Sequence, residues 1–141
     1  MTFLGQAFIT GAVAPSAPNG RTVLIADDHD LFAESLTAFL STEDRITVVG
    51  RAANGEEAAR LCAELRPDIV LMDISMPVLN GFEAAKLIRA EAPSTRVLFL
   101  TGSASPADVA QARAAGGIGY VTKDKLATEL VDAIVAAPGP A

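Results

Sequence analysis

The sequence predicts an α/β fold, in which five helices cover both faces of a doubly wound, five-stranded parallel sheet. Short apolar or β-branched runs alternate five times with segments of helical period, and the connections between them are short. The third run, residues 69–72, is apolar at every position. A strand that is covered on both faces lacks the two-residue alternation of a half-exposed strand. This run is therefore predicted to be a central strand.

The first strand and helix come directly after Arg21. Residues 22–26 form a short apolar run that ends in the acidic sequence Asp27-Asp28-His29-Asp30. Residues 31–40 follow, with apolar side chains at helical spacing, namely Phe32, Leu36, Phe39 and Leu40. We therefore expect a strand, an acidic turn and a helix.

The second strand and helix follow the same pattern. Residues 46–50 are short and β-branched, and the next helix opens at Asn54 or Gly55 and ends before Pro67. Cys62 lies among apolar residues of that helix, which favours a core side chain over a reactive thiol. As the single cysteine it excludes an internal disulfide and favours a reducing compartment, here the cytoplasm.

The third strand ends on a carboxylate. Asp73 directly follows residues 69–72, and the chain then breaks at Pro77 into a loop that Gly81 closes, before a helix over residues 82–90. Open α/β sheets bind their ligands at the carboxyl ends of strands, which makes Asp73 a candidate site residue. Taken alone, a carboxylate that caps the turn is the simpler interpretation.

The fourth and fifth strands also end in polar residues. Residues 96–100 precede Thr101, and residues 118–122 precede Lys123. The remaining helices are predicted over residues 106–115, with Ser105 as cap and Gly116-Gly117 as stop, and over residues 126–136.

Composition and the amino-terminal stretch argue against several other classes of protein. The 141 residues are half hydrophobic with a net charge of −6, which is typical of one compact domain and disfavours binding of nucleic acid by this chain alone. Residues 1–20 carry no charged side chain and read as a flexible leader or a small docking segment. A secretory signal or a membrane span is disfavoured, because no basic residue precedes a short, Gly-interrupted apolar part.

Four of the five strands thus end in residues suited to phosphate chemistry. Since carboxyl ends of parallel strands share one edge, Asp27, Asp28, Asp73, Thr101 and Lys123 are expected to converge. Three carboxylates at one edge repel each other unless a cation lies among them, and hard oxygen ligands beside phosphate favour magnesium. Asp73 could then attack phosphorus, while Lys123 and Thr101 contact the phosphoryl oxygens.

The combined motifs resemble a CheY-like receiver domain of bacterial response regulators. They are Asp27-Asp28, Asp73 followed by Met76-Pro77 and Asn80-Gly81, Thr101-Gly102, and residues 119–123. The resemblance covers roughly residues 21–136, within a receiver domain expected over residues 21–137, and implies the flavodoxin-like strand order 2-1-3-4-5. Asp27-Asp28-His29 with Leu31, and Lys123-Asp124 without a following proline, are more similar to the NarL/FixJ subgroup, which carries LuxR-type output domains.

The resemblance implies that Asp73 is the phosphoacceptor, which takes a phosphoryl group from a phosphohistidine of a sensor histidine kinase. Asp28 and Asp73 would bind magnesium directly, together with the backbone carbonyl of Ser75, whereas Asp27 would act through water. His29 is interpreted as a helix-start residue rather than a metal ligand or base.

The resemblance also implies a phosphate-dependent switch. Lys123 would bind the phosphate, Thr101 would move towards it, and the ring of Tyr120 would turn inward. A half-buried strand aromatic is the structural alternative for Tyr120. Three positions depart from the subgroup: Asp30 stands where proline is frequent, Ala33 where arginine is common, and Gly117, in place of alanine, is expected to loosen the connection before the fifth strand.

Receivers of this subgroup usually precede a DNA-binding domain. We expect residues 138–141 to begin a linker or tail, transcription to be controlled by an output domain that this chain lacks, and phosphorylation to favour a homodimer. A stand-alone receiver or a non-phosphorylated pseudo-receiver is the alternative. A haloacid-dehalogenase-like phosphatase with Asp28 as nucleophile would leave Asp73 unexplained, and a dinucleotide-binding domain is disfavoured because no G-x-G-x-x-G follows the first strand.

Overall fold

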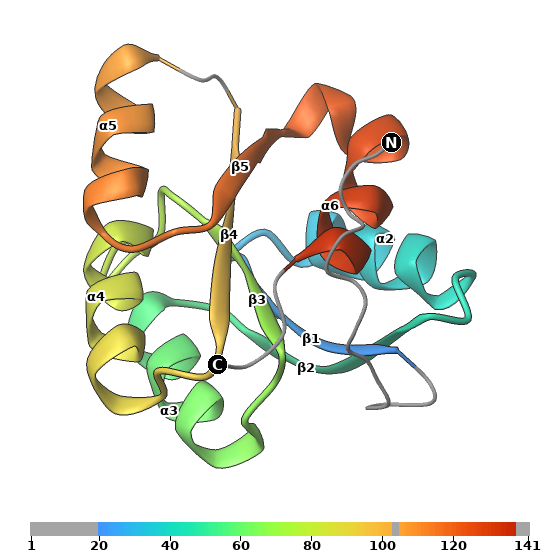
Figure 1. Ribbon diagram of the computed structural model, residues 1–141, viewed down its shortest axis with the longest axis horizontal. Coiled ribbons are helices and arrows are strands. Elements are labelled where there is room, and N and C mark those ends of the chain that lie inside the picture. Colours follow the sequence, from blue (N-terminus) through green and yellow to red (C-terminus); the bar gives the residue numbers. More distant parts are fainter. Residues whose placement is uncertain (1–19, 103–104, 138–141) are drawn as a thin grey trace.

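The computed structural model describes residues 20–102 and 105–137. Five parallel strands form one sheet in the order β2-β1-β3-β4-β5, as predicted (Figure 1). The predicted linker at 138–141 and all but the last residue of the predicted leader lie outside the described residues. None of the described helices is long and apolar enough to cross a membrane.

The strands and helices alternate along the chain. The strands are β1 (Arg21–Ala26), β2 (Ile46–Ala52), β3 (Ile69–Asp73), β4 (Arg96–Thr101) and β5 (Gly119–Thr122). The helices are α2 (Asp30–Ser41), α3 (Gly55–Leu65), α4 (Gly81–Glu91), α5 (Pro106–Ala114) and α6 (Val131–Ala136), the last preceded by a 3-10 turn (Lys123–Lys125) and a π-helical turn (Leu126–Leu130).

The helices form a layer on each side of the sheet. Helices α3, α4 and α5 cover one face, and α2 and α6 cover the other (Figure 1). Every residue of β3 is buried, which confirms the central strand predicted from its uninterrupted apolar sequence. Successive β3 side chains enter opposite cores: Val70 packs towards α3 and α4, and Leu71 towards α2 and α6.

Polar caps fix the start of three helices. Asn54 accepts a hydrogen bond from the backbone N–H of Glu57 at the start of α3. At the start of α4 the Asn80 side chain accepts a hydrogen bond from the backbone N–H of Glu83, and the Glu83 side chain accepts one from the backbone N–H of Asn80. This reciprocal pair is a capping box. Ser105 caps α5, as predicted. These caps set where each helix begins relative to the strand before it.

The structure differs from the sequence prediction in two elements. β2 continues to Ala52, because its pairing with β1 extends to Ala26, and the ladder shifts by one residue between the Val23–Val48 and Leu24–Gly50 pairs. The predicted helix over residues 126–136 is not uniform, since its first five residues form a π-helical turn. Such turns frequently occur beside functional sites, and this one lies three residues after Lys123.

Gly117 is closely packed rather than loose. A Cβ atom there would lie 2.6 Å from a ring carbon of Phe99 and 3.1 Å from the carbonyl oxygen of Ala112. The ring of Phe99 occupies the space that a side chain at residue 117 would need. The expected loosening before β5 is therefore wrong.

Candidate functional site

The predicted site residues converge at the carboxyl edge of the sheet. Asp27 follows β1, whereas Asp73 and Thr101 are the last residues of β3 and β4, and Lys123 follows β5. Asp27, Asp73 and Thr101 are buried, at 0%, 5% and 6% exposure. Because all these strands are parallel, their ends meet although they are far apart in the sequence.

Lys123 lies between two of the buried carboxylates. Its Nζ is 3.2 Å from Asp27 Oδ2 and 3.4 Å from Asp73 Oδ1. The same Nζ lies 4.3 Å from the ring centroid of Phe32, on α2. One cation therefore contacts two carboxylates and an aromatic ring, which fixes its position and leaves the acidic edge with excess negative charge.

Burial raises the pKa of the Asp73 carboxyl above its ordinary value of 3.8. The neighbouring Asp27 carboxylate raises this pKa further, and Lys123 acts in the opposite direction. Asp73 is thus an acid whose charged form is disfavoured by its surroundings. Cys62 differs in kind: its burial raises the pKa of its thiol to about 12, which agrees with a core role.

The turn after β1 carries Asp28 and His29. The backbone N–H of His29 donates to Asp27 Oδ1 at 2.8 Å. The ring Nδ1 of His29 lies 3.2 Å from Asp27 Oδ1 and 3.3 Å from Asp28 Oδ1, although 67% of the side chain is exposed. His29 is the residue before α2, as predicted, and its ring also faces the carboxylates.

The acidic edge fits a hard divalent cation. Ligand atoms of Asp27, Asp28, His29 and Asp73 all lie within 4.8 Å of one another. Asp28 Oδ1 is buried and has no hydrogen-bond partner among the described residues. Buried carboxylate oxygens without partners are costly, and coordination of a cation would satisfy them.

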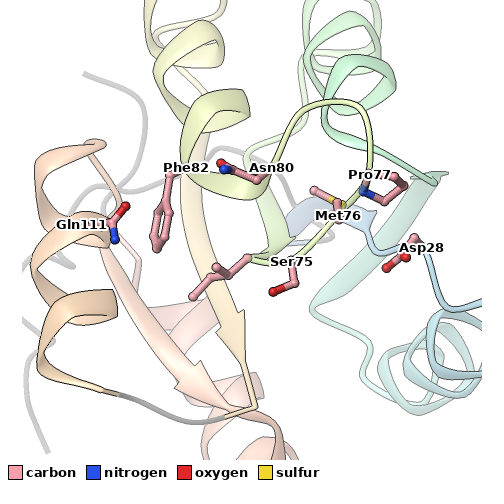
Figure 2. A pocket seen from close by; sticks show the side chains of 8 residues that line it. Asp28, Ser75, Met76, Pro77, Asn80, Phe82 and Gln111 are labelled. Atoms are coloured by element: carbon pink, nitrogen blue, oxygen red, sulfur yellow. The ribbon is translucent and has the colours of Figure 1, made fainter.

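Two open clefts border this edge. One, of about 390 Å³, is lined by Asp73, Ser75, Thr101 and Asp108 among others, and gives direct access to the Asp73 carboxylate. The other, of about 550 Å³, has Asp28 at one end and Gln111 of α5 at the other, with Ser75 between them (Figure 2). Ser75 borders both clefts, next to the carboxylates.

The loop after β3 holds Asp73 by close backbone contact. The N–H of Gly81 donates to the carbonyl of Ile74 at 2.9 Å, and a Cβ atom at Gly81 would lie 2.3 Å from the Asp73 carbonyl oxygen. Val78, within this loop, has a positive φ of 71°, which a β-branched residue rarely adopts. The predicted Gly81 signal therefore marks a position where only glycine fits.

Thr101 and Tyr120 both border a small crevice beside α5, together with Val109 and Ala112. Thr101 also lines the cleft at Asp73. The side chain of Tyr120 is 43% exposed, whereas that of Thr101 is buried. The predicted pair is thus close in space, and the structural alternative for Tyr120, a half-buried strand aromatic, agrees with its exposure.

Two further residues at this edge were not identified from the sequence. Phe32 was counted only as a helix-core residue, although its ring contacts Lys123. Arg51, near the end of β2, donates to the backbone carbonyl of Asp27 and pairs with Asp30. Its one signal is a charged residue within a strand that is otherwise apolar or small.

Comparison with known proteins gives a consistent result. Residues 23–135 match the model of the response regulator receiver domain. The transcriptional regulatory protein LnrK of Bacillus subtilis is 43% identical over 113 residues, which are 80% of this chain and 51% of LnrK. LiaR, a transcriptional regulatory protein of the same organism, is 39% identical over 82% of this chain and 54% of its own length.

Solved structures agree with these relatives. The signal receiver domain of NarL from Mycobacterium tuberculosis superposes with a TM-score of 0.79 at 37% identity, over 83% of this chain and 94% of that one. A LuxR-family two-component response regulator from Aurantimonas gives a TM-score of 0.78 at 36% identity, over 82% of each chain. The chain spans about half the length of the curated relatives it matches. It belongs to the response regulator receiver domain family and is a receiver of the LuxR/NarL type.

Proposed function

We propose that this receiver accepts a phosphoryl group on Asp73 from a phosphohistidine of a sensor histidine kinase and then switches conformation to control an output. The supporting observation is the position of Asp73. Its carboxylate ends the central strand, contacts Lys123 and opens onto the cleft that Thr101 lines. A nucleophile, a cation and a hydroxyl donor thereby face one space.

In the proposed step a carboxylate oxygen of Asp73 attacks phosphorus. The bond between phosphorus and the imidazole nitrogen breaks, and its electron pair leaves with the imidazole. Lys123 balances charge on the phosphoryl oxygens, and the Thr101 hydroxyl donates to one of them. Hydrolysis of the acyl phosphate would return Asp73 to its free carboxylate. Positioning and charge neutralisation supply most of the catalysis in such a transfer.

Magnesium is the proposed cofactor. Asp28, Asp73 and the backbone carbonyl of Ser75 would bind it directly, and Asp27 through water. When bound, the ion neutralises charge shared by the carboxylates and the phosphoryl oxygens. The acidic cluster and the buried Asp28 oxygen, which accepts no hydrogen bond from the described residues, support this assignment.

For the response to phosphate we propose that Thr101 moves towards the phosphoryl group and that the ring of Tyr120 turns inward. The crevice that both residues border supports this pairing. Residues 21–137 would be the receiver domain. The relatives, of which this chain spans about half, are named transcriptional regulatory proteins, so the output proposed here is transcription, through a DNA-binding domain beyond this chain, with phosphorylation favouring a homodimer.

Intact mass spectrometry tests the phosphoacceptor assignment. Incubation with magnesium and acetyl phosphate should add the mass of one phosphoryl group to the wild type, and the adduct should be absent without magnesium and in Asp73→Asn. An adduct that survives Asp73→Asn but disappears in Asp28→Asn would identify Asp28 as the nucleophile and contradict the proposal. A wild type that takes no phosphate from acetyl phosphate or from any phosphorylated kinase would indicate a pseudo-receiver.

A further inference from the structure

Arg51 connects the end of β2 to the acidic turn after β1. Its Nη2 and Nε donate to the backbone carbonyl of Asp27, at 2.9 and 3.3 Å. Its Nη1 lies 2.7 Å from Asp30 Oδ1. One planar guanidinium therefore contacts the residue before the turn and the first residue of α2.

These contacts continue the pairing of β1 with β2. The backbone N–H of Asp27 donates to the carbonyl of Ala52 at 3.0 Å, and the ladder ends there. Beyond this point, Arg51 holds both ends of a turn that carries Asp28 and His29. The Asp28 oxygen that has no hydrogen-bond partner lies within this turn, so its direction depends on the backbone that Arg51 restrains.

We propose that Arg51 is a positioning residue of the metal site. Its guanidinium fixes the turn from Asp27 to Asp30, so that the Asp28 carboxylate already faces Asp73 before a cation binds. Asp30 holds the guanidinium in the orientation that serves this purpose. The inference rests on the proposed magnesium site and adds a residue that does not itself touch the metal, the phosphate or Asp73.

Loss of the positive charge of Arg51 and loss of its hydrogen bonds should have opposite effects on magnesium affinity. A positive side chain beside a cluster of carboxylates opposes the binding of a cation, so removal of its charge alone should tighten magnesium binding. Removal of its hydrogen bonds frees the turn and should weaken binding. Asp30 is 78% exposed, and exposed ion pairs contribute little to stability, so variants at Arg51 should fold.

The experiment measures the magnesium dissociation constant of the full chain by calorimetry for wild type, Arg51→Gln and Arg51→Lys. Lysine keeps the charge but cannot bind the Asp27 carbonyl and Asp30 as a planar fork. Arg60→Gln is the matched control, because the ion pairs of Arg60 within residues 20–102 and 105–137 are with Glu57 and Glu64 on its own helix.

Both Arg51 variants should bind magnesium about tenfold more weakly than the wild type, which is the lower range for loss of a residue that orients a metal ligand. A second readout needs no metal: the backbone amide of His29, which donates to Asp27 Oδ1 at 2.8 Å, should shift in the NMR spectrum of both variants. The Arg60→Gln control should match the wild type in both readouts.

Three results would overturn the inference. Tighter binding by Arg51→Gln with unchanged Arg51→Lys would mean that Arg51 acts only through charge. Equal binding by the wild type and both variants would mean that the turn needs no support. A wild type that binds no magnesium would refute the magnesium site itself, and this arm separates that failure from a failure of the role of Arg51 alone.

Discussion

Two carboxylates flank the central strand, and their surroundings differ. Asp68 precedes β3 and forms a closed set of hydrogen bonds with Thr22: Asp68 Oδ2 accepts from the Thr22 N–H at 2.9 Å and from its hydroxyl at 3.3 Å, while the Thr22 hydroxyl accepts from the Asp68 N–H at 2.9 Å. Asp73 ends β3, shares the ammonium of Lys123 with Asp27, and has a raised pKa.

The two ends of β3 therefore serve different purposes, stability at the amino end and chemistry at the carboxyl end. At the amino end, polar groups satisfy each other and hold β1 beside β3. At the carboxyl end, buried carboxylates face one another, and an oxygen of Asp28 has no hydrogen-bond partner in the described chain. Local conflict of this kind marks the places where a fold serves chemistry at the expense of its own stability.

The largest expected effect comes from the backbone contact behind Asp73. Gly81→Ala would place a Cβ atom 2.3 Å from the Asp73 carbonyl oxygen. The strand end or the start of α4 must then move, so the free energy of unfolding should fall by about 3 kcal/mol in urea denaturation. Gly102→Ala is the control, because among the described residues, its chain neighbours aside, no atom lies within 4 Å of the position of a Cβ there. Equal effects at the two glycines would contradict this picture of the carboxyl edge.

At the amino end, Asp68→Ala should lower the free energy of unfolding by about 2 kcal/mol. The substitution leaves the partly buried Thr22 N–H without its acceptor, and an unsatisfied donor costs about 1–3 kcal/mol. Chemical denaturation measures the loss, with exposed Asp44→Ala as the control, expected within about 0.5 kcal/mol of wild type. An Asp68→Ala protein as stable as the wild type would contradict the stabilising role of Asp68 and with it the difference between Asp68 and Asp73.

Magnesium should stabilise the protein through the carboxyl end alone. At a magnesium concentration of about ten times the dissociation constant, linkage predicts a gain of about 1.4 kcal/mol in the free energy of unfolding. The gain should disappear in Asp28→Asn and persist in Asp44→Asn, in which an exposed acid outside the cluster is changed. Stabilisation that survives Asp28→Asn would place the ion elsewhere.

Phe32→Leu should give the smallest change. An ammonium over an aromatic face gains about 0.5–1 kcal/mol at a partly exposed position, so phosphorylation of Asp73 should slow by about two- to fivefold if the ring positions Lys123. Phe32→Tyr should keep the wild-type rate. Phe39→Leu, on the same helix, controls for lost packing, and equal slowing by both leucine variants would assign the effect to packing.

Much of the fold could be predicted because the sequence signals of strands and helices are local. Apolar runs, helix caps and glycine stops identified the strands and helices, although α6 begins five residues later than predicted, after a π-helical turn, and β2 ends two residues later. The bulge at Val49 could not be predicted from the sequence, since Val48 and Val49 are equally suited to a strand. The packing of Phe99 against Gly117 depends on two elements far apart in sequence, and no local rule predicts it.

The candidate site also contains residues that could be predicted and residues that could not. Acids and a lysine at strand ends could be predicted to converge, because parallel topology brings those ends to one edge. Arg51 and Phe32 could not be assigned, because their roles depend on the path of the turn after β1 and on the direction of Lys123. These two positioning residues leave weaker sequence signals than the acids and the lysine that they position.

The most direct test of the central contrast is the pH dependence of unfolding for wild type and Asp73→Asn, without metal. Because the folded-state pKa of Asp73 is raised above 3.8, its contribution to stability is present below that pH and is lost as pH rises through the folded pKa. Asp73→Asn should therefore become the more stable protein towards about pH 7. A wild type that is equally or more stable than Asp73→Asn at neutral pH would contradict the account.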